Sequence, residues 1–403
     1  MDLSVVICAY NTKAEYLNAC LKSITNSTLK NYEILLIDDG SLVDYRELAE
    51  KYGAKYVKTE NRGLLAARLF ALELVSGEYI AFVDSDDMVS FNYHMPMLEK
   101  AKETGADIVI NNWAFYTDSA KYYCTWEKKW TVDWQGDMCL DKFLENRGKS
   151  HAFFVLWNKI IKTDLYRLAK KEVEATEAIM NKMVFSEDAL QSFFLFKHAK
   201  RVVNIHNGYY FYRIHDDQSV NAYKEDALKA QIDQMVITLD TMKANVTKPE
   251  HIACVEDWAA MMSRTQYSYA KADKFTGLYD HIKEKYGITK LKEAKSSDGA
   301  KYLDHTLLPD NFEDIDKELY KIYSTSDDVT VMYDTGDKYV SDAINYISSA
   351  KVVAENAPKR TLMVPKGRNS FRNKLFHCGL VTHLGAVLFK KGSKLRAKIK
   401  ALL

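Results

Sequence analysis

The sequence predicts an α/β fold, with a mixed, mainly parallel sheet flanked by helices and a mostly helical C-terminal region. Between Leu3 and Tyr116, apolar runs of strand length alternate with segments whose apolar residues recur at helical spacing. The strand-length runs are almost continuously apolar, which is typical of parallel strands buried on both faces. Beyond Asn221 the helical spacing predominates. These patterns favour strand–helix alternation followed by helices.

The first part of the chain is expected to alternate strand and helix. The expected strands are LSVVICAY (3–10), EILLIDDG (33–40), AKYVKTE (54–60), YIAFVDSDD (79–87) and ADIVINNWAFY (106–116). The expected helices cover 14–27, 45–51, 63–77 and 92–104. Gly77 is expected to close the third of these helices as its C-cap.

The pattern changes after residue 121. KYYCTWEKKWTVDW (121–134) partly alternates and predicts antiparallel hairpin strands, and a helix at 187–198 precedes a strand at 206–215. Amphipathic helices are expected at 226–242 and 251–272, and the polar stretch 290–306 is a candidate linker. We therefore expect three parts, which are a first domain (1–220), a helical region (221–325) and a C-terminal region (326–403).

Charge is unevenly distributed along the 403 residues. Twelve Lys and Arg but no Asp or Glu lie in 359–403, and the remainder has 44 basic and 55 acidic residues, a net charge of −11. This predicts a basic tail on an acidic body. Six scattered cysteines without metal-site spacing, no signal-peptide pattern and no apolar stretch of about 20 residues predict a reduced, cytoplasmic protein.

Polar residues follow three of the expected parallel strands. They are Ala9-Tyr10-Asn11, Asp38-Asp39-Gly40-Ser41 and Asp84-Ser85-Asp86-Asp87, and Asn61 precedes the helix that carries Arg68. Taken alone, DDGS is better explained as a turn with a helix cap. Ligands of open parallel sheets bind beyond the carboxyl ends of the strands, so together these groups predict one pocket.

The acids at 84–87 indicate a cation. Carboxylates this close repel one another, and a hard divalent ion such as Mg²⁺ or Mn²⁺ would relieve that repulsion. The chain contains no G-x-G-x-x-G after the first strand and no G-x-x-x-x-G-K-[ST], which disfavours dinucleotide and P-loop sites. The sequence therefore predicts that Mn²⁺ or Mg²⁺ at this strand tip holds a diphosphate.

The ordered segments SVVICAYN, EILLIDDGS, ENRGLLAARLFAL, GEYIAFVDSDD and FSEDAL resemble the motifs of family 2 glycosyltransferases of the GT-A fold. The resemblance covers about the first 220 residues. It implies sugar transfer from a nucleotide diphosphate donor, usually a UDP-sugar, with inversion at the anomeric carbon.

The resemblance also implies roles for individual positions. Asp188 matches the general base, and Asp86 and His215 match metal or diphosphate contacts. Donor-binding positions implied in the same way are Ala9, Tyr10, Asn11, Asp39, Asn61, Arg68, Asp84 and Ser85. Leu69 replaces the Asn of the family's ARN motif, so donor contacts there depart from the family pattern. Glu187, Trp157, Trp126 and Arg213 are candidate acceptor contacts.

Simpler explanations exist for several of these residues. Asp188 can be an acid that favours a helix N-terminus, His215 can be structural, and the tryptophans of 113–157 can be core residues. The expected function is metal-dependent, inverting transfer to a glycan, lipid-linked or glycoprotein hydroxyl. The alternative is a non-catalytic nucleotide- or carbohydrate-binding protein on a degenerate GT-A scaffold.

The basic tail and the helical region have further expected roles. The tail has an apolar run, 375–389, next to six basic residues within 390–400, and this combination favours binding to an anionic membrane surface. Packing on the acidic body is the main alternative, and sparse aromatics disfavour nucleic acid. The helical region is expected to serve acceptor binding or homo-oligomer formation.

Overall fold

Strand β1 (Leu3–Ala9) lies inside the larger sheet of the computed structural model, which describes residues 1–117, 122–124, 131–214, 224–293, 329–332 and 360–363. Within these residues the sheet has eight strands in the order β3-β2-β1-β4-β10-β6-β11-β9. Their bounds are β2 Tyr32–Asp38, β3 Lys55–Lys58, β4 Tyr79–Phe82, β6 Ile108–Ile110, β9 Asp133–Gln135, β10 Lys159–Lys162 and β11 Arg201–Asn204.

The sheet is mixed and mainly parallel, as predicted. Strand β1 pairs parallel with β2 and β4, β2 with β3, and β11 with β6. Strand β10 runs antiparallel to both β4 and β6, and β9 runs antiparallel to β11. The carboxyl ends of β1, β2, β4 and β6 therefore meet at one edge of the sheet.

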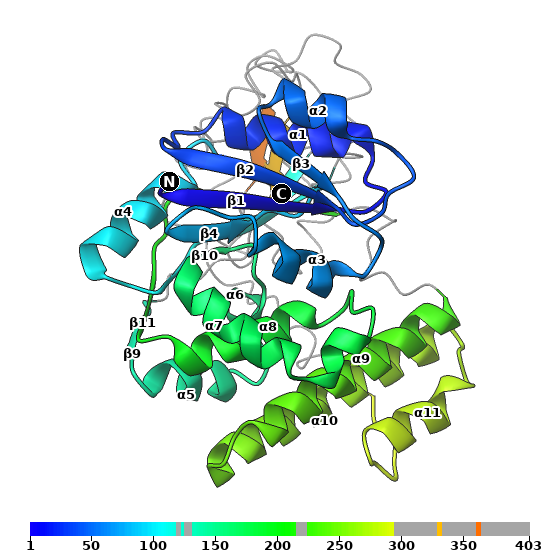
Figure 1. Ribbon diagram of the computed structural model, residues 1–403. Helices are drawn as coiled ribbons and strands as arrows, with labels where there is room; N and C mark the ends of the chain where they lie inside the picture. The colour runs from blue at the N-terminus through cyan, green and yellow to red at the C-terminus, as the bar shows by residue number, and fades with distance from the viewer. Residues whose placement is uncertain (118–121, 125–130, 215–223, 294–328, 333–359, 364–403) are drawn as a thin grey trace, which may run out of the picture.

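Helices cover both faces of this sheet (Figure 1). Side chains of β1 alternate between the faces, so Val6 joins one apolar core while Val5 and Ile7 join the other. The second core includes α1 and α4, and the first includes α3, α7 and α8. The bounds are α1 Ala14–Thr25, α2 Arg46–Lys51, α3 Leu64–Ala71, α4 His94–Thr104, α5 Met138–Glu145, α6 His151–Phe154, α7 Thr163–Glu174, the 3₁₀ helix η1 Glu177–Met180, and α8 Glu187–His198.

A second sheet contains strands from both halves of the chain. In the described residues its order is β14-β13-β8-β7-β12-β5. The strands are β5 Met88–Val89, β7 Trp113–Thr117, β8 Tyr122–Cys124, β12 Tyr210–Ile214, β13 Val329–Met332 and β14 Arg360–Met363. Strand β12 pairs with β5, which directly follows the acidic strand tip, and so reaches the candidate site.

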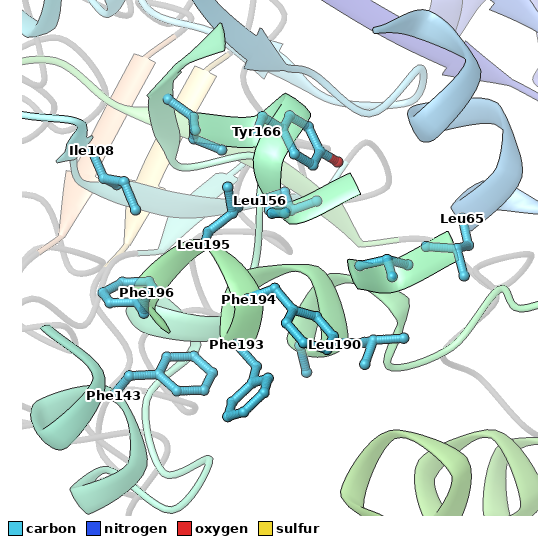
Figure 2. Packing of buried hydrophobic residues seen from close by; sticks show 14 of the residues in the cluster. Leu65, Ile108, Phe143, Leu156, Tyr166, Leu190, Phe193, Phe194, Leu195 and Phe196 are labelled. Carbon is cyan, nitrogen blue, oxygen red and sulfur yellow. The ribbon is translucent and has the colours of Figure 1, made fainter. Parts of the chain in front are cut away.

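Helices α9 (Glu225–Ala244), α10 (Pro249–Ala272) and α11 (Leu278–Lys285) form a further layer beneath α8 (Figure 1). Helix α9 contacts α8, and α10 contacts α9 and α5. Figure 2 shows the aromatic side chains of α5 and α8 that fill the core there. Phe143 stacks on Phe196 with ring centroids 5.0 Å apart and meets Trp258 of α10 at 6.1 Å. The helical layer therefore shares its core with the sheet-covering helices.

Two element predictions were wrong in their bounds. Helix α3 ends at Ala71 rather than at Gly77. Gly77 instead lies against β1, where an added Cβ would come within 2.5 Å of the Ser4 nitrogen. The single strand expected over 106–116 is two strands in different sheets, and Asn111 and Asn112 separate them. The Asn111 side chain binds the backbone at this break. Its Oδ1 accepts a hydrogen bond from the Asn112 backbone N–H at 2.9 Å.

Several predictions fall outside the described residues. They concern His215, Trp126, most of the expected linker and the basic tail. The division of the chain at 220 and 325 also stays a prediction. Among the described residues, Cys8, Cys20, Cys139 and Cys254 carry free thiols. No helix in the described part of the chain has the length and apolar character needed to cross a bilayer.

Candidate active site

The predicted polar groups come together at the carboxyl edge of the main sheet. In the parallel register Ala9 lies opposite Asp38, and Val6 lies opposite Phe82. The residues that follow these strands are therefore neighbours. The structure brings together the three groups that sequence patterns placed at this edge.

The loop after β1 is fixed to the loop after β2. Asn11 adopts a left-handed backbone with φ of 51°, and its N–H donates to Ser41 Oγ at 2.9 Å. Its Oδ1 accepts from the Leu42 N–H at 2.8 Å. Ala9 is buried, whereas Tyr10 is 55% exposed. These bonds hold the two loops in place while the Tyr10 side chain remains accessible.

Asp39 binds the loop that precedes α3. Its two carboxylate oxygens accept from the Arg62 and Gly63 N–H groups, each at 2.8 Å. Asn61 lies close by, because an added Cβ on Gly40 would come within 2.6 Å of the Asn61 nitrogen. Each Asp39 oxygen keeps a second lone pair that can accept from a ligand. Asp39 therefore has a structural role in addition to the predicted contact with the donor base.

The acidic strand tip is bound by β12 and α1. Asp87 is buried and accepts from the Tyr210 hydroxyl and the Arg213 N–H, both at 2.7 Å. Ser85 Oγ lies 2.6 Å from Thr12 Oγ1. Burial, and then the charges of Asp86 and Asp84, raise the pKa of Asp87 well above its usual range. The tip thus crowds three carboxyl groups together, and β12 binds one of them.

Arg68 connects this tip to the start of α8. Its guanidinium donates to Asp84 Oδ1 at 3.0 Å and to Glu187 Oε1 at 2.8 Å, and Arg68 and Glu187 are buried. Burial opposes the charge of Arg68, but the two carboxylates outweigh it and raise its pKa. Arg68, which the resemblance predicts to bind the donor, therefore connects the acids after β4 to the Glu187–Asp188 pair, which we call the ED motif.

The two acids of the ED motif begin helix α8. Glu187 points to Arg68, and the half-buried Asp188 accepts the Ala189 N–H at 2.8 Å. Burial raises the pKa of Asp188 to about 6, although Arg68 opposes this shift. Burial and the charge of Asp188 raise the pKa of Glu187 to about 8. Asp188 is thus a carboxylate that is ionised at neutral pH but retains basicity.

Arg213 and Trp157, two of the predicted acceptor contacts, lie beside the strand tip or beside the residues that bind it. Arg213 donates from Nε to the Asp86 carbonyl at 2.6 Å and covers the Tyr16 ring at 4.3 Å. Trp157 is buried and stacks on Tyr210 with centroids 4.5 Å apart. Both therefore support the acidic tip through β12.

Sequence reasoning assigned no individual role to Asp87, Tyr210 or Lys159. Asp87 was placed among the clustered acids, and Tyr210 lay within the strand expected at 206–215. Lys159 is buried, and its ammonium donates to the carbonyls of Ala152 and Val155. A lysine inside an apolar strand pattern is a usable signal, because burying it requires several acceptors.

The carboxylates suit a divalent cation. The charge of Asp86, after burial, contributes to the raised pKa of Asp84, and positive charge beside them would relieve this repulsion. Among the residues that the structure describes, no three His, Cys, Asp or Glu side chains form a metal-holding group. Two carboxylates plus diphosphate oxygens are a typical arrangement for Mg²⁺, so the donor set fits.

The fold and the acid-lined sheet edge are those of the GT-A architecture. The S. aureus TarS 1–349 crystal structure has this fold in common with the chain. It matches with a TM-score of 0.50 and 18% identity, over 75% of this chain and 88% of that one. At this identity the match supports the fold alone.

Sequence comparisons extend this to the family. The family model described as Glycosyl transferase family 2 matches residues 4–171. Glycosyltransferase GlyG of Streptococcus pneumoniae is 30% identical over 225 residues, which are 52% of this chain and 70% of GlyG. Glycosyltransferase GlyA of the same organism is 27% identical over 269 residues, and 62% of this chain matches 36% of GlyA. The chain belongs to glycosyltransferase family 2.

Proposed function

We propose that this chain is a metal-dependent inverting glycosyltransferase that uses a UDP-sugar. The observation that carries the proposal is the Arg68 bridge, because it joins the donor-side acid Asp84 to Glu187 of the ED motif. Glu187 is 119 residues from Arg68 in the sequence, so folding alone brings the two motifs together. The family membership and the acids at the sheet edge support the same function.

In the proposed reaction, Asp188 removes the proton from an acceptor hydroxyl. The hydroxyl oxygen then forms a bond to the anomeric carbon of the donor sugar. The bond from that carbon to the diphosphate breaks on the opposite face, so its configuration inverts. The nucleoside diphosphate leaves with the electron pair. A base whose pKa is about 6 suits this role at neutral pH.

Asp86 would hold Mn²⁺ or Mg²⁺ in this proposal, together with oxygens of the donor diphosphate, and Asp84 beside it would bind the donor. When bound, the ion neutralises charge that develops on the leaving diphosphate. Arg213 keeps the backbone at Asp86 in place through its carbonyl. His215 stays a predicted contact to the metal or diphosphate.

The donor base would stack on the exposed Tyr10 ring and hydrogen bond to Asp39. The donor-binding roles of Asn11, Asn61 and Ser85 follow from their place at the same edge. The transferred group would be a hexose or an N-acetylhexosamine. These assignments extend the family membership to particular contacts.

The acceptor would be a glycan, a lipid-linked glycan or a glycoprotein. The basic tail in 359–403 favours an acceptor at an anionic membrane surface, on which the enzyme would be peripheral. Flotation with anionic and neutral liposomes tests this, with the full chain compared with a chain that ends at Pro358. Equal binding of both chains would remove the membrane argument.

A panel of nucleotide sugars, with and without Mn²⁺, tests the function. A true donor should raise the melting temperature only with metal, since ligand binding stabilises the native state. That donor should then be hydrolysed slowly or transferred to a glycan acceptor with inverted anomeric configuration, read by NMR. Stabilisation without any turnover would favour the alternative of a non-catalytic nucleotide-binding protein.

A further inference from the structure

The turn that precedes the candidate base is backbone-strained. Ser186 has φ of 59°, in the left-handed region that residues other than glycine rarely adopt. Helix α8 begins at the next residue and carries Asp188 in its first turn. Strain of this kind persists only when neighbouring contacts fix the conformation. The position of Asp188 therefore depends on whatever holds residues 184–186.

Helix α9 provides those contacts. Gln234 Oε1 accepts from the Val184 N–H at 3.0 Å and from the Phe185 N–H at 2.9 Å. Ser186 Oγ donates to the Gln234 carbonyl at 3.2 Å and lies 2.9 Å from Thr238 Oγ1. One side-chain oxygen thus binds two consecutive backbone donors that lie before the helix. The strained residue itself is bound by the next turn of α9.

The opposite side of the turn has a weaker attachment. The Leu65 N–H of α3 donates to the Met183 carbonyl at 3.3 Å. An added Cβ on Gly63 would come within 3.0 Å of both the Lys182 carbonyl carbon and the Met183 oxygen. The turn therefore lies between α3, which Asp39 attaches to the donor side, and α9. Loss of the α9 contacts would leave the turn with the long bond from α3 and with bonds to its own chain segment, such as that from the Leu190 N–H to the Ser186 carbonyl at 3.1 Å.

We propose that Gln234 and Thr238 are positioning residues that hold the Asp188 carboxylate toward the acceptor hydroxyl. This inference rests on the proposed role of Asp188 as the base. Both residues lie beyond the matched family region, which ends at residue 171, and neither belongs to a motif of the resemblance. The hydrogen bonds of Gln234 and Thr238 described above go to residues 184–186 and not to the strand-tip acids, so we expect these two residues to affect the chemical step.

The test compares Gln234→Ala and Thr238→Val with two conservative changes, Gln234→Glu and Thr238→Ser. A glutamate oxygen still accepts from both N–H groups, and serine keeps the hydroxyl. Lys229→Ala is the control, because Lys229 is an exposed residue of the same helix. All variants are made in the full chain, and thermal melting confirms that each one is folded.

We expect Gln234→Ala to lower kcat by about 10²-fold, because misplacement of a catalytic group by about 1 Å has an effect of this size. The KM for the donor should stay unchanged, and Gln234→Glu and Thr238→Ser should recover most of the rate. Wild-type kcat in Gln234→Ala would overturn the proposal. Equal loss in Gln234→Ala and Gln234→Glu would overturn it as well.

Amide hydrogen exchange supplies a readout that does not need turnover. The Val184 and Phe185 amides should exchange faster in Gln234→Ala than in the wild type, while amides of β1 stay protected. If the wild-type chain transfers no sugar, the proposed function fails. Amide exchange then still tests whether Gln234 fixes the turn at residues 184–186. Unchanged protection of these two amides would overturn the proposal in either case.

Discussion

The two acidic groups of the candidate site are built in different ways. The acids at 84–87 end a buried strand, and Asp87 is fixed by Tyr210 and Arg213 of β12. The ED pair instead begins a helix after a strained turn, and that turn is held by Gln234 of α9. The acids at the strand tip are thus positioned by strands, whereas the position of Glu187 and Asp188 depends on α9, which lies outside the sheet.

The two halves of the site therefore depend on contacts from different distances along the chain. The strand tip needs only parallel register and a following turn, so it is recognisable as a short motif. The ED turn needs contacts from residues about 50 positions later, and 49 positions separate Phe185 from Gln234. Arg68 is the shared component, because it binds an acid from each group.

The strongest way to separate the two acidic groups is Asp188→Asn. Loss of a general base should lower kcat by about 10²–10⁴-fold, while UDP affinity in Mn²⁺ stays at the wild-type level. Steady-state kinetics and calorimetry with UDP measure the two quantities. Near-wild-type turnover would place the base elsewhere, and Glu187→Gln is then the next variant to make.

Replacement of Arg68 should affect the strand-tip acids and the ED pair together, because Arg68 binds one acid of each. Arg68→Met leaves the buried Glu187 and the partly exposed Asp84 without their cation, and breaking a buried ion pair in this way costs about 3–5 kcal/mol of unfolding free energy. Urea denaturation of the wild type, Arg68→Met and Arg68→Lys measures the loss. A difference below about 1 kcal/mol for Arg68→Met would mean that the bridge contributes little to stability.

Asp86→Asn should affect the acids at 84–87 and leave the ED pair unchanged. Removal of a carboxylate that would hold the metal should abolish the increase in UDP affinity that Mn²⁺ produces, without lowering the melting temperature of the unliganded chain. Asp44→Asn is a matched control, since Asp44 is exposed and forms an ion pair with Arg46, two residues further along the chain. Unchanged UDP affinity of Asp86→Asn in Mn²⁺ would contradict the metal assignment.

The crowded contact of Gly63 with Lys182 and Met183 can be disturbed by a smaller change. Gly63 has φ of 91°, and an added methyl would press on Lys182 and Met183 before the ED turn. Gly63→Ala should therefore lower the unfolding free energy by about 1–3 kcal/mol, as overpacking does. Gly53→Ala, which has a left-handed φ but nothing within 4 Å, controls for backbone strain alone. Equal losses would remove the contact argument.

The pH dependence of the rate sharpens the assignment of the ED pair. Burial raises the pKa of Asp188 to about 6, and a base must be deprotonated to act. Turnover should therefore be constant above about pH 7 and fall roughly tenfold per pH unit below 6. A profile of kcat between pH 4.5 and 8.5 checks this. If the residual kcat of Asp188→Asn falls at low pH in the same way, the titrating group is not Asp188.

The strand tip could be predicted from sequence because neighbouring residues in the chain determine it. Continuous apolar residues followed by Asp84, Asp86 and Asp87 give a buried strand and its polar end, and parallel pairing fixes which edge they share. The Arg68–Glu187 pair could not be predicted, because no pattern reports a contact between residues 119 positions apart. The ED pair itself was found through the family resemblance and not through spacing.

Local patterns also failed where tertiary contacts override them. Gly77 looks like a helix C-cap, but close approach to β1 explains the glycine and α3 ends earlier. Asp39 was assigned to the ligand alone, although its two oxygens bind backbone N–H groups of residues 62 and 63. In both cases the sequence shows an unusual residue, but only the fold shows which neighbour requires it.

The attachment of the ED turn to α9 bears on how this enzyme can be shortened. A fragment that ends at residue 220 would contain every motif of the family resemblance, yet it would lack the helix that fixes Ser186. The smallest fragment that retains the ED geometry extends at least to Ala244, where α9 ends. For this chain, fragment boundaries should follow hydrogen bonds to the ED turn and not the last recognisable motif.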